Sequence, residues 1–147
     1  MSYKVSLVDW DTKYLSLRQL RDRVFIQEQH VPQADEWDGK DEVAKHFLCE
    51  KHTDEFVGCA RLLVETLHQR PVFHIGRVAV LPQYRGQGIG RQIMLTVLKY
   101  CKTQSTETDI YLHAQINRQA FYEHIGFIAT GDVFMDAGIP HIEMWYK

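Results

Sequence analysis

The residues best placed to do chemistry lie in one glycine-rich segment in the second half of the chain. A nearly continuous apolar run at 72–81 predicts a buried central strand, and it leads into Arg85-Gly86-Gln87-Gly88-Ile89-Gly90-Arg91. Glycines let a backbone approach a ligand closely and point successive N–H groups the same way. Because a helix is predicted to begin within this segment, its free donors and its dipole favour an anion, and a diphosphate fits that chemistry. The side chains of Arg85 and Arg91 can add charge-assisted contacts.

Two common nucleotide-binding patterns are absent from this segment. It lacks the G-x-x-x-x-G-K-[ST] phosphate loop, which argues against ordinary nucleoside triphosphate hydrolysis. The dinucleotide pattern G-x-G-x-x-G also fails, because Arg91 or Ile93 stands where its last glycine would be. From these residues alone, the remaining alternative to diphosphate binding is a glycine-rich turn with a purely structural role.

A second segment of interest is Asn117-Arg118-Gln119-Ala120-Phe121-Tyr122-Glu123-His124-Ile125-Gly126-Phe127, which follows a strand predicted at 110–115. Asn117 is a candidate cap for a short helix that continues through His124. Gly126 is expected to end that helix in a left-handed conformation.

Together the two segments resemble the GNAT N-acetyltransferase superfamily. The first is similar to its [Q/R]-x-x-G-x-[G/A] motif, and the second is similar to its N-x-x-A-x-x-x-Y-x-x-x-G-F region, shortened by a few residues. Further stretches carry the likeness over nearly the whole chain, and some of them resemble the ElaA-like branch of bacterial GNAT proteins. These stretches are Val24–Gln29, Asp38–Asp41, Arg77–Val80, Pro82–Tyr84 and Gly138–Ile142.

The resemblance implies a fold and a set of coenzyme contacts. The expected fold is α/β, with a mixed, mostly antiparallel sheet flanked by helices. Its parallel fourth and fifth strands are expected to splay apart and admit the pantetheine arm of acetyl-CoA, while the glycine-rich turn holds the diphosphate. The expected coenzyme contacts are Val78, Ala79, Val80, Arg85, Gly86, Gln87, Gly88, Ile89, Gly90, Arg91, Asn117, Phe121 and Tyr122.

The implied reaction is direct, sequential transfer of an acetyl group from acetyl-CoA to a primary amine, which we expect to belong to a small molecule. The developing oxyanion needs a fixed donor, for which the backbone N–H of Val80 is the family's answer. Tyr122 matches the tyrosine that GNAT enzymes use as general acid toward the CoA thiolate, and its alternative role is aromatic packing beside Phe121 and Phe127. A function of a different class is a non-catalytic module that senses acyl-CoA, which needs the glycine turn but no acid or base.

The general base stays open among three side chains and water. An amine with a pKa of about 10 is almost wholly charged at neutral pH, so a proton acceptor must help. His74 precedes Val80 on the same predicted strand, and strand alternation places it on the side of Val78 and Val80 unless a bulge breaks the parity. His113 on the fifth strand and Glu28 at the end of the first helix are the competitors. Otherwise each histidine is a partly buried imidazole and Glu28 is a solvated helix end.

The segment 35–42 holds five acids, one lysine and Trp37. An acidic rim beside the acceptor pocket would attract a cationic amine, and Trp37 could add a cation–π contact. A run of charges is more commonly a solvated loop, and this is the interpretation that we favour. Eight histidines invite a metal hypothesis, yet neither H-E-x-x-H nor a Cys/His ligand spacing is present, so no metal site is predicted.

Hydrophobic periodicity predicts the elements that must position these residues. A strand at 3–9 precedes a helix capped by Asp11 or Thr12; Val31-Pro32 ends this helix, and residues 33–42 have the character of a loop. The apolar positions of the first helix are Leu15, Leu17, Leu20, Val24 and Phe25.

The rest of the chain predicts a hairpin, a long helix and two late strands. The hairpin strands lie at 46–51 and 56–65 around a turn at 53–55, and the late strands lie at 127–130 and 141–146. One face of the helix after the glycine turn carries Ile89, Ile93, Met94, Val97, Leu98 and Cys101.

Composition bounds these interpretations. A chain of 147 residues with 45% hydrophobic and 24% charged residues predicts a single globular domain over 1–147. A net charge of -2 gives no general attraction to nucleic acid or to anionic membranes. Neither a signal peptide nor an apolar stretch of roughly 20 residues is present, so a cytoplasmic location is expected. Cys49, Cys59 and Cys101 are interpreted as reduced core thiols. In the family, exposed late strands often pair two copies into a homodimer.

Overall fold

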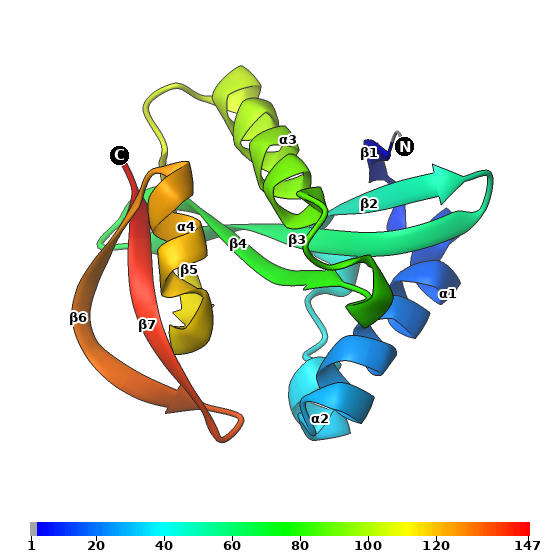
Figure 1. Ribbon diagram of the computed structural model, residues 1–147. Helices are drawn as coiled ribbons and strands as arrows, with labels where there is room; N and C mark the ends of the chain where they lie inside the picture. The colour runs from blue at the N-terminus through cyan, green and yellow to red at the C-terminus, as the bar shows by residue number, and fades with distance from the viewer. Residues whose placement is uncertain (1–2) are drawn as a thin grey trace.

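The computed structural model describes residues 3–147 and contains one seven-stranded sheet in the order β1-β2-β3-β4-β5-β7-β6 (Figure 1). All neighbouring strands are antiparallel except β4 and β5, which are parallel. The predicted mixed, mostly antiparallel sheet is therefore confirmed. The strands are β1 (Lys4–Val8), β2 (Lys45–His52), β3 (Glu55–Leu67), β4 (Arg70–Val80), β5 (Asp109–Gln115), β6 (Phe127–Asp136) and β7 (Ile139–Tyr146).

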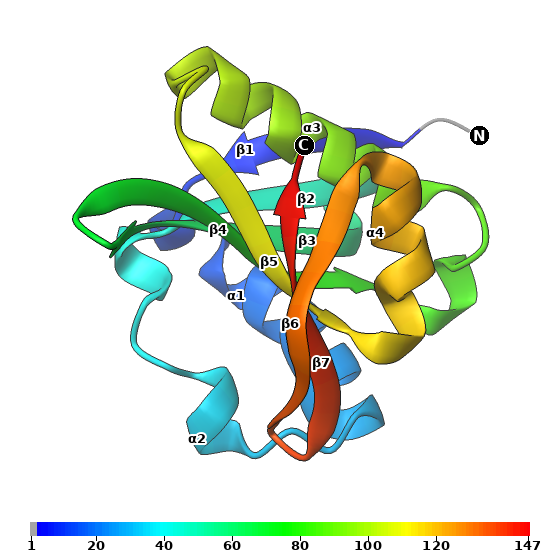
Figure 2. The same cartoon turned by 90° about the vertical axis from the view of Figure 1, so that its left-hand side faces the viewer.

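Helices cover both faces of the sheet (Figures 1 and 2). Side chains of α3 and α4 pack into one core cluster on one face, and side chains of α1 pack with Leu48, Cys59 and Ala79 in a second cluster on the other. The α-helices are α1 (Trp10–Arg21), α2 (Gln33–Glu36), α3 (Ile89–Gln104) and α4 (Gln119–Ile125), with short 3₁₀ turns at Asp41–Val43, Pro82–Tyr84 and Ile116–Arg118.

The helix after the glycine turn has the predicted buried face. All six apolar positions named for it are buried in α3, and the three cysteines are buried and unpaired. Burial raises the pKa of the Cys49 thiol to about 11, so the interpretation of these residues as core thiols is confirmed.

The first helix differs from the prediction at both ends. It begins at Trp10 after the extended residue Asp9, so the expected caps Asp11 and Thr12 were wrong. The start is set by packing, since Trp10 lies against His46 with ring centroids 4.8 Å apart. Leu15 is exposed because residues two positions apart on a helix cannot both face the sheet, and Leu17 does so.

Beyond Arg21 the chain continues in wider π-helical turns over Asp22–Glu28, where the N–H of Gln29 donates to the Val24 carbonyl (3.1 Å). Such wide turns are rare and often occur beside functional sites. Residues 33–42, predicted as a loop, contain the one-turn helix α2 and a 3₁₀ turn.

In the C-terminal part, the predicted elements occur in the expected order, but the two late strands are longer than predicted. Asn117 does not cap α4, because a 3₁₀ turn at Ile116–Arg118 leads into that helix. Gly126 does end α4, with a positive φ of 123°. Strand β6 runs on to Asp136 through an irregularity after Thr130, where its sequence loses apolar alternation and pairing with β7 alone keeps it extended.

Candidate active site

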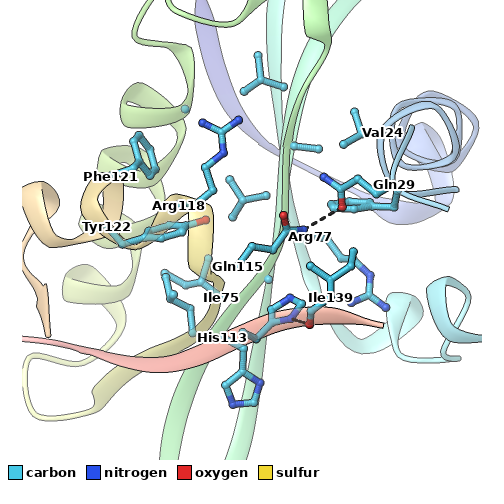
Figure 3. A pocket seen from close by; sticks show the side chains of 18 of the residues that line it. Val24, Gln29, Ile75, Arg77, His113, Gln115, Arg118, Phe121, Tyr122 and Ile139 are labelled. Atoms are coloured by element: carbon cyan, nitrogen blue, oxygen red, sulfur yellow. Dashed lines mark hydrogen bonds between the residues drawn. The ribbon is translucent and has the colours of Figure 1, made fainter. Parts of the chain in front are cut away.

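Strands β4 and β5 separate halfway along their length. Their parallel pairing ends at Ile75 and Leu112; beyond it β4 stays with β3 and β5 stays with β7. A cavity of about 590 Å³ occupies this region and is lined from both faces of the sheet (Figure 3). The predicted splay of the two parallel strands is confirmed.

The glycine turn lies at one side of this cavity, and no side chain at Gly86 or Gly88 covers its backbone N–H groups. Gly86 and Gly88 both have φ of 81°, and the space where a Cβ would stand is open at each. The first backbone bond at the start of α3 runs from the Gln92 N–H to the Gly88 carbonyl (3.1 Å), so the N–H groups just before Gln92 have no partner within the helix. Gly90 has a different reason for lacking a side chain, because a Cβ there would lie 3.2 Å from Phe121. The residues present fit an anion such as a diphosphate.

The end of β4 turns alternate backbone groups toward the open side of the splay. The N–H of Leu81 donates to Val57 on β3 (2.9 Å), so Leu81 and Ala79 are directed toward β3. The backbone groups of Val78 and Val80 therefore point toward the space that β5 has left. A chain with alternating amides, such as a pantetheine arm, can add there like a strand.

Arg85 joins three parts of the site. Its Nε donates to the Val80 carbonyl (2.9 Å), and its two terminal nitrogens donate to the Glu28 carboxylate (2.6 and 2.7 Å). This pairing with Arg85 lowers the pKa of Glu28, and a stabilised carboxylate is a weaker proton acceptor. Glu28 does not line the cavity, although the neighbouring Gln29 does. The structure thus places Glu28 as a partner of Arg85 rather than beside the cavity.

Most of the expected coenzyme contacts lie around this one cavity, and two do not. Gln87 accepts a hydrogen bond from the Tyr3 hydroxyl (2.7 Å) and, like Asn117, is not among the lining residues. Arg118, which sequence reasoning passed over, does line it. The expected contacts that do so are Val78, Ala79, Val80, Arg85, Gly86, Gly88, Ile89, Gly90, Arg91, Phe121 and Tyr122.

Tyr122 extends from α4 toward the centre of the cavity (Figure 3). Burial raises the pKa of its phenol to about 12, which keeps the proton on the oxygen at neutral pH. Its ring also packs edge-on against Phe121 and Phe127, with centroids 5.0 and 6.0 Å away. Geometry is therefore compatible with both roles considered for this residue, proton donor and packing.

His74 and His113 lie on the opposite face of the sheet from Tyr122. A bulge at Arg77, which has a φ of 51°, shifts the register between β3 and β4. Because of this bulge Ile75, and not His74, shares the α3 face with Val78 and Val80, so the parity expected for His74 was wrong. His74 instead approaches His113, with ring centroids 5.2 Å apart, and both line the cavity.

The acidic segment 35–42 is neither a solvated loop nor a free acidic rim. Glu36 and Asp41 are buried, and together with Asp38 they pair with three arginines. The sequence favoured the other interpretations because these arginines lie on α1, β3 and β4, far from the segment along the chain. The contacts are Arg21–Glu36 (2.7 Å), Arg21–Asp41 (2.6 Å), Arg61–Asp38 (2.8 Å), Arg61–Asp41 (3.1 Å), Arg77–Glu36 (3.1 Å) and Arg77–Asp38 (3.3 Å).

Trp37 belongs to the same arrangement, because its ring lies under the guanidinium groups of Arg18 and Arg21 at 4.4 and 5.1 Å. Its cation–π contacts are thus internal. The charged network holds α2 against the bulge of β4, where the Arg77 side chain lines the cavity.

Comparisons with known proteins agree with this geometry. A family described as the acetyltransferase (GNAT) domain matches residues 10–147. The chain belongs to the GNAT acetyltransferase family. ElaA of Escherichia coli is 40% identical over 131 residues, which cover 88% of this chain and 84% of ElaA.

Solved GNAT structures superpose closely on the chain. The crystal structure of Escherichia coli ElaA has a TM-score of 0.87 and 33% identity, covering 99% of this chain and 100% of that one. An acyl-CoA N-acyltransferase from Pseudomonas aeruginosa has the same TM-score with 32% identity and the same coverage. Naa50 of Arabidopsis thaliana, in complex with the bisubstrate analogue CoA-Ac-MVNAL, has a TM-score of 0.75 with 25% identity and covers 98% of each chain.

Membership in the GNAT family supports acyl transfer as the activity, with acyl-CoA as the donor class. Within residues 3–147 no group of three or more His, Cys, Asp or Glu side chains is arranged to hold a metal ion. Over the same residues, no helix has the length and apolar character needed to cross a bilayer.

Sequence reasoning missed several residues that line the cavity around the end of β5 and the β6–β7 hairpin. Gln115 at the end of β5 donates to Gln29 after α1 (2.8 Å), a contact drawn as a dashed line in Figure 3. The hairpin between β6 and β7 adds Asp136, Ile139 and His141 to the lining. The only sequence signal for the hairpin residues was the short likeness at Gly138–Ile142, which carries no assignment of roles.

Proposed function

We propose that this protein is an N-acetyltransferase that moves the acetyl group of acetyl-CoA directly onto the primary amine of a small molecule. The observation that carries the proposal is that one cavity joins the glycine turn, the open edge of β4 and Tyr122 on one side to the two histidines on the other. Coenzyme and acceptor can thus meet at the splay from opposite faces of the sheet. A bisubstrate analogue that links CoA to a peptide binds the related Arabidopsis protein, which supports such a meeting point.

In this proposal the backbone carries most of the coenzyme binding. The N–H groups of Gly86 to Gly90 would hold the diphosphate, and the backbone of Val78 and Val80 would pair with the pantetheine amides. The N–H of Val80 would then donate to the thioester oxygen as negative charge develops on it, because that group points toward the splay. Arg91 and Arg118 would add positive charge beside the phosphates.

Proton transfers complete the reaction. The amine lone pair forms the C–N bond as the carbonyl electrons move to oxygen, and collapse of this intermediate breaks the C–S bond. Tyr122 gives its proton to the departing thiolate and recovers one from the new amide nitrogen through water. A phenol held protonated by burial can fill this role at neutral pH.

The test combines binding and turnover on folded protein. Calorimetry with CoA and acetyl-CoA is expected to give saturable heat, and thiol release from acetyl-CoA is expected with at least one member of a panel of polyamines, amino sugars, amino acids and peptides. Binding without thiol release across the panel would favour an acyl-CoA sensor. No heat with either ligand would refute the coenzyme assignment.

A further inference from the structure

A carboxylate that the sequence did not single out holds one of the two cavity histidines. Glu65 on β3 accepts hydrogen bonds from His74 Nδ1 (2.9 Å) and from the Tyr111 hydroxyl. The three side chains come from three adjacent strands, since Leu63 lies opposite His74 on β3 and Tyr111 lies opposite it on β5. His74 lines the cavity, whereas Glu65 and Tyr111 stand behind it.

Aromatic stacking fixes the plane of the His74 ring. The Tyr111 ring is stacked on it with a centroid separation of 4.3 Å and an interplanar angle of 18°. Tyr111 is in turn stacked on Trp145 at 4.9 Å and 23°. With its plane fixed by the stack and Nδ1 fixed by Glu65, the ring has Nε2 as its remaining nitrogen.

The charges around the ring define its protonation. Burial raises the pKa of Glu65, but the hydrogen bonds from Tyr111 and His74 outweigh it and leave that pKa lowered. Burial also lowers the pKa of His74, and the Glu65 contact only partly offsets this. At neutral pH the ring is therefore neutral, with its proton on Nδ1 facing the carboxylate and a lone pair on Nε2.

Other charged groups also act on this pair. Arg61 on β3 and His113 on β5 both disfavour a positive charge on His74. Lys40 helps to keep Glu65 ionised. Glu143 on β7 acts on Tyr111 and lies 3.5 Å from His113 Nε2.

His113 is held less firmly than His74. Its contact with Glu143 is longer, and its aromatic neighbours His74, Tyr111 and Phe134 meet it edge-on instead of stacking on it. Of the two histidines, only His74 combines a short carboxylate contact with a stacked partner. This is the arrangement that holds an imidazole in one tautomer and orientation.

We propose that His74 Nε2 accepts the proton of the acceptor amine, and that Glu65 and Tyr111 are positioning residues for this step. The inference rests on the proposed acetyltransferase function. The acceptor ammonium gives one proton to His74 Nε2, and the neutral amine then attacks the thioester as described above. Glu65 stabilises the imidazolium until its proton passes to solvent. Ammonium and acetyl-CoA thus become amide, CoA thiol and one released proton.

The test measures how turnover with the acceptor found in the panel depends on pH. Turnover should fall at low pH as His74 becomes protonated, and this fall is the acid limb of the pH–rate profile. Glu65→Gln removes the negative charge, so the acid limb should move down by about one pH unit while kcat falls roughly 10- to 100-fold. Tyr111→Phe removes the hydrogen bond that the tyrosine hydroxyl donates to Glu65. The Glu65 carboxylate should then stabilise the His74 imidazolium more strongly and raise the His74 pKa, so the acid limb should move to higher pH. A purely structural role for these residues would not shift the limb in opposite directions.

The matched control is Glu143→Gln, which changes a neighbouring carboxylate that does not contact His74 and should move the acid limb much less than Glu65→Gln does. Circular dichroism and CoA affinity check that each variant is folded, and NMR titration of the His74 imidazole without acceptor should reproduce the two opposite shifts. An unmoved limb in Glu65→Gln, or shifts of the same sign in both variants, would overturn the proposal for His74. Absence of turnover by the wild-type protein with every amine would instead refute the acetyltransferase function itself.

Discussion

Replacing Gly88 with alanine tests whether the turn before α3 holds the coenzyme diphosphate. Gly88 has φ of 81° and lines the cavity, and a Cβ at this position would enter open space. Gly131 on β6 is a matched control, because it has φ of 77°, equally open surroundings and no place in the cavity lining. The two substitutions therefore impose the same backbone strain, and only one of them alters the proposed binding surface.

The two glycine variants should differ in their affinity for CoA but not in their loss of stability. A left-handed backbone costs a residue with a Cβ about 1–2 kcal/mol, so both variants should melt about 2–8 °C lower than the wild type. This strain is present with and without ligand and cancels from the binding free energy. In Gly88→Ala the methyl group would displace a phosphate from a donor, and losing one charge-assisted hydrogen bond costs about 1.5–3 kcal/mol. The Kd for CoA should therefore rise about 10- to 150-fold.

Calorimetry with CoA gives the Kd, and thermal denaturation followed by circular dichroism gives the melting temperature. Gly131→Ala should bind CoA with wild-type affinity despite its lower melting temperature. Equal Kd values for Gly88→Ala and Gly131→Ala would refute the placement of the diphosphate at this turn.

Three further predictions concern catalysis and stability. Tyr122→Phe should lower kcat roughly 10- to 1000-fold with little change in the Kd for CoA, and full activity in steady-state assays would remove Tyr122 from the mechanism. Glu36→Gln should cost about 3–5 kcal/mol in urea denaturation because it removes a buried carboxylate that pairs with both Arg21 and Arg77. Glu42→Gln in the exposed part of the same segment should change stability by less than about 0.5 kcal/mol, and similar losses in both variants would contradict the network. Burial raises the pKa of Asp38 and Asp41, but their arginine partners leave both lowered, so the unfolded chain binds more protons and stability should fall as the pH drops below the ordinary carboxyl value of about 3.9. Urea titrations across that range should show an acid loss that is smaller in Asp38→Asn, and an equal loss would assign the effect to other groups.

The glycine turn and α3 were predictable because their signals are local. A few residues are enough to recognise glycine at alternate positions. The same holds for the helical spacing of apolar residues that buries Ile89, Ile93 and Val97. The first helix shows the limit of such signals. Its apolar residues were recognised, but its start at Trp10 and its wide turns after Arg21 depend on the sheet and on His46, which lie elsewhere in the chain.

What the sequence determined by itself was the family, the succession of strands along the chain and the glycine turn before α3. Tertiary structure alone decided which side chains face one another across the splay. The bulge at Arg77 put His74 on the opposite face from Val78 and Val80, and strand pairing placed it beside Tyr111 of β5 and Glu65 of β3. A register shift of one residue reverses which face a side chain occupies, and no local pattern in the sequence announces it. The buried pairs of Glu36, Asp38 and Asp41 were hidden for the same reason, since the pairing of a charge depends on distance in space rather than along the chain.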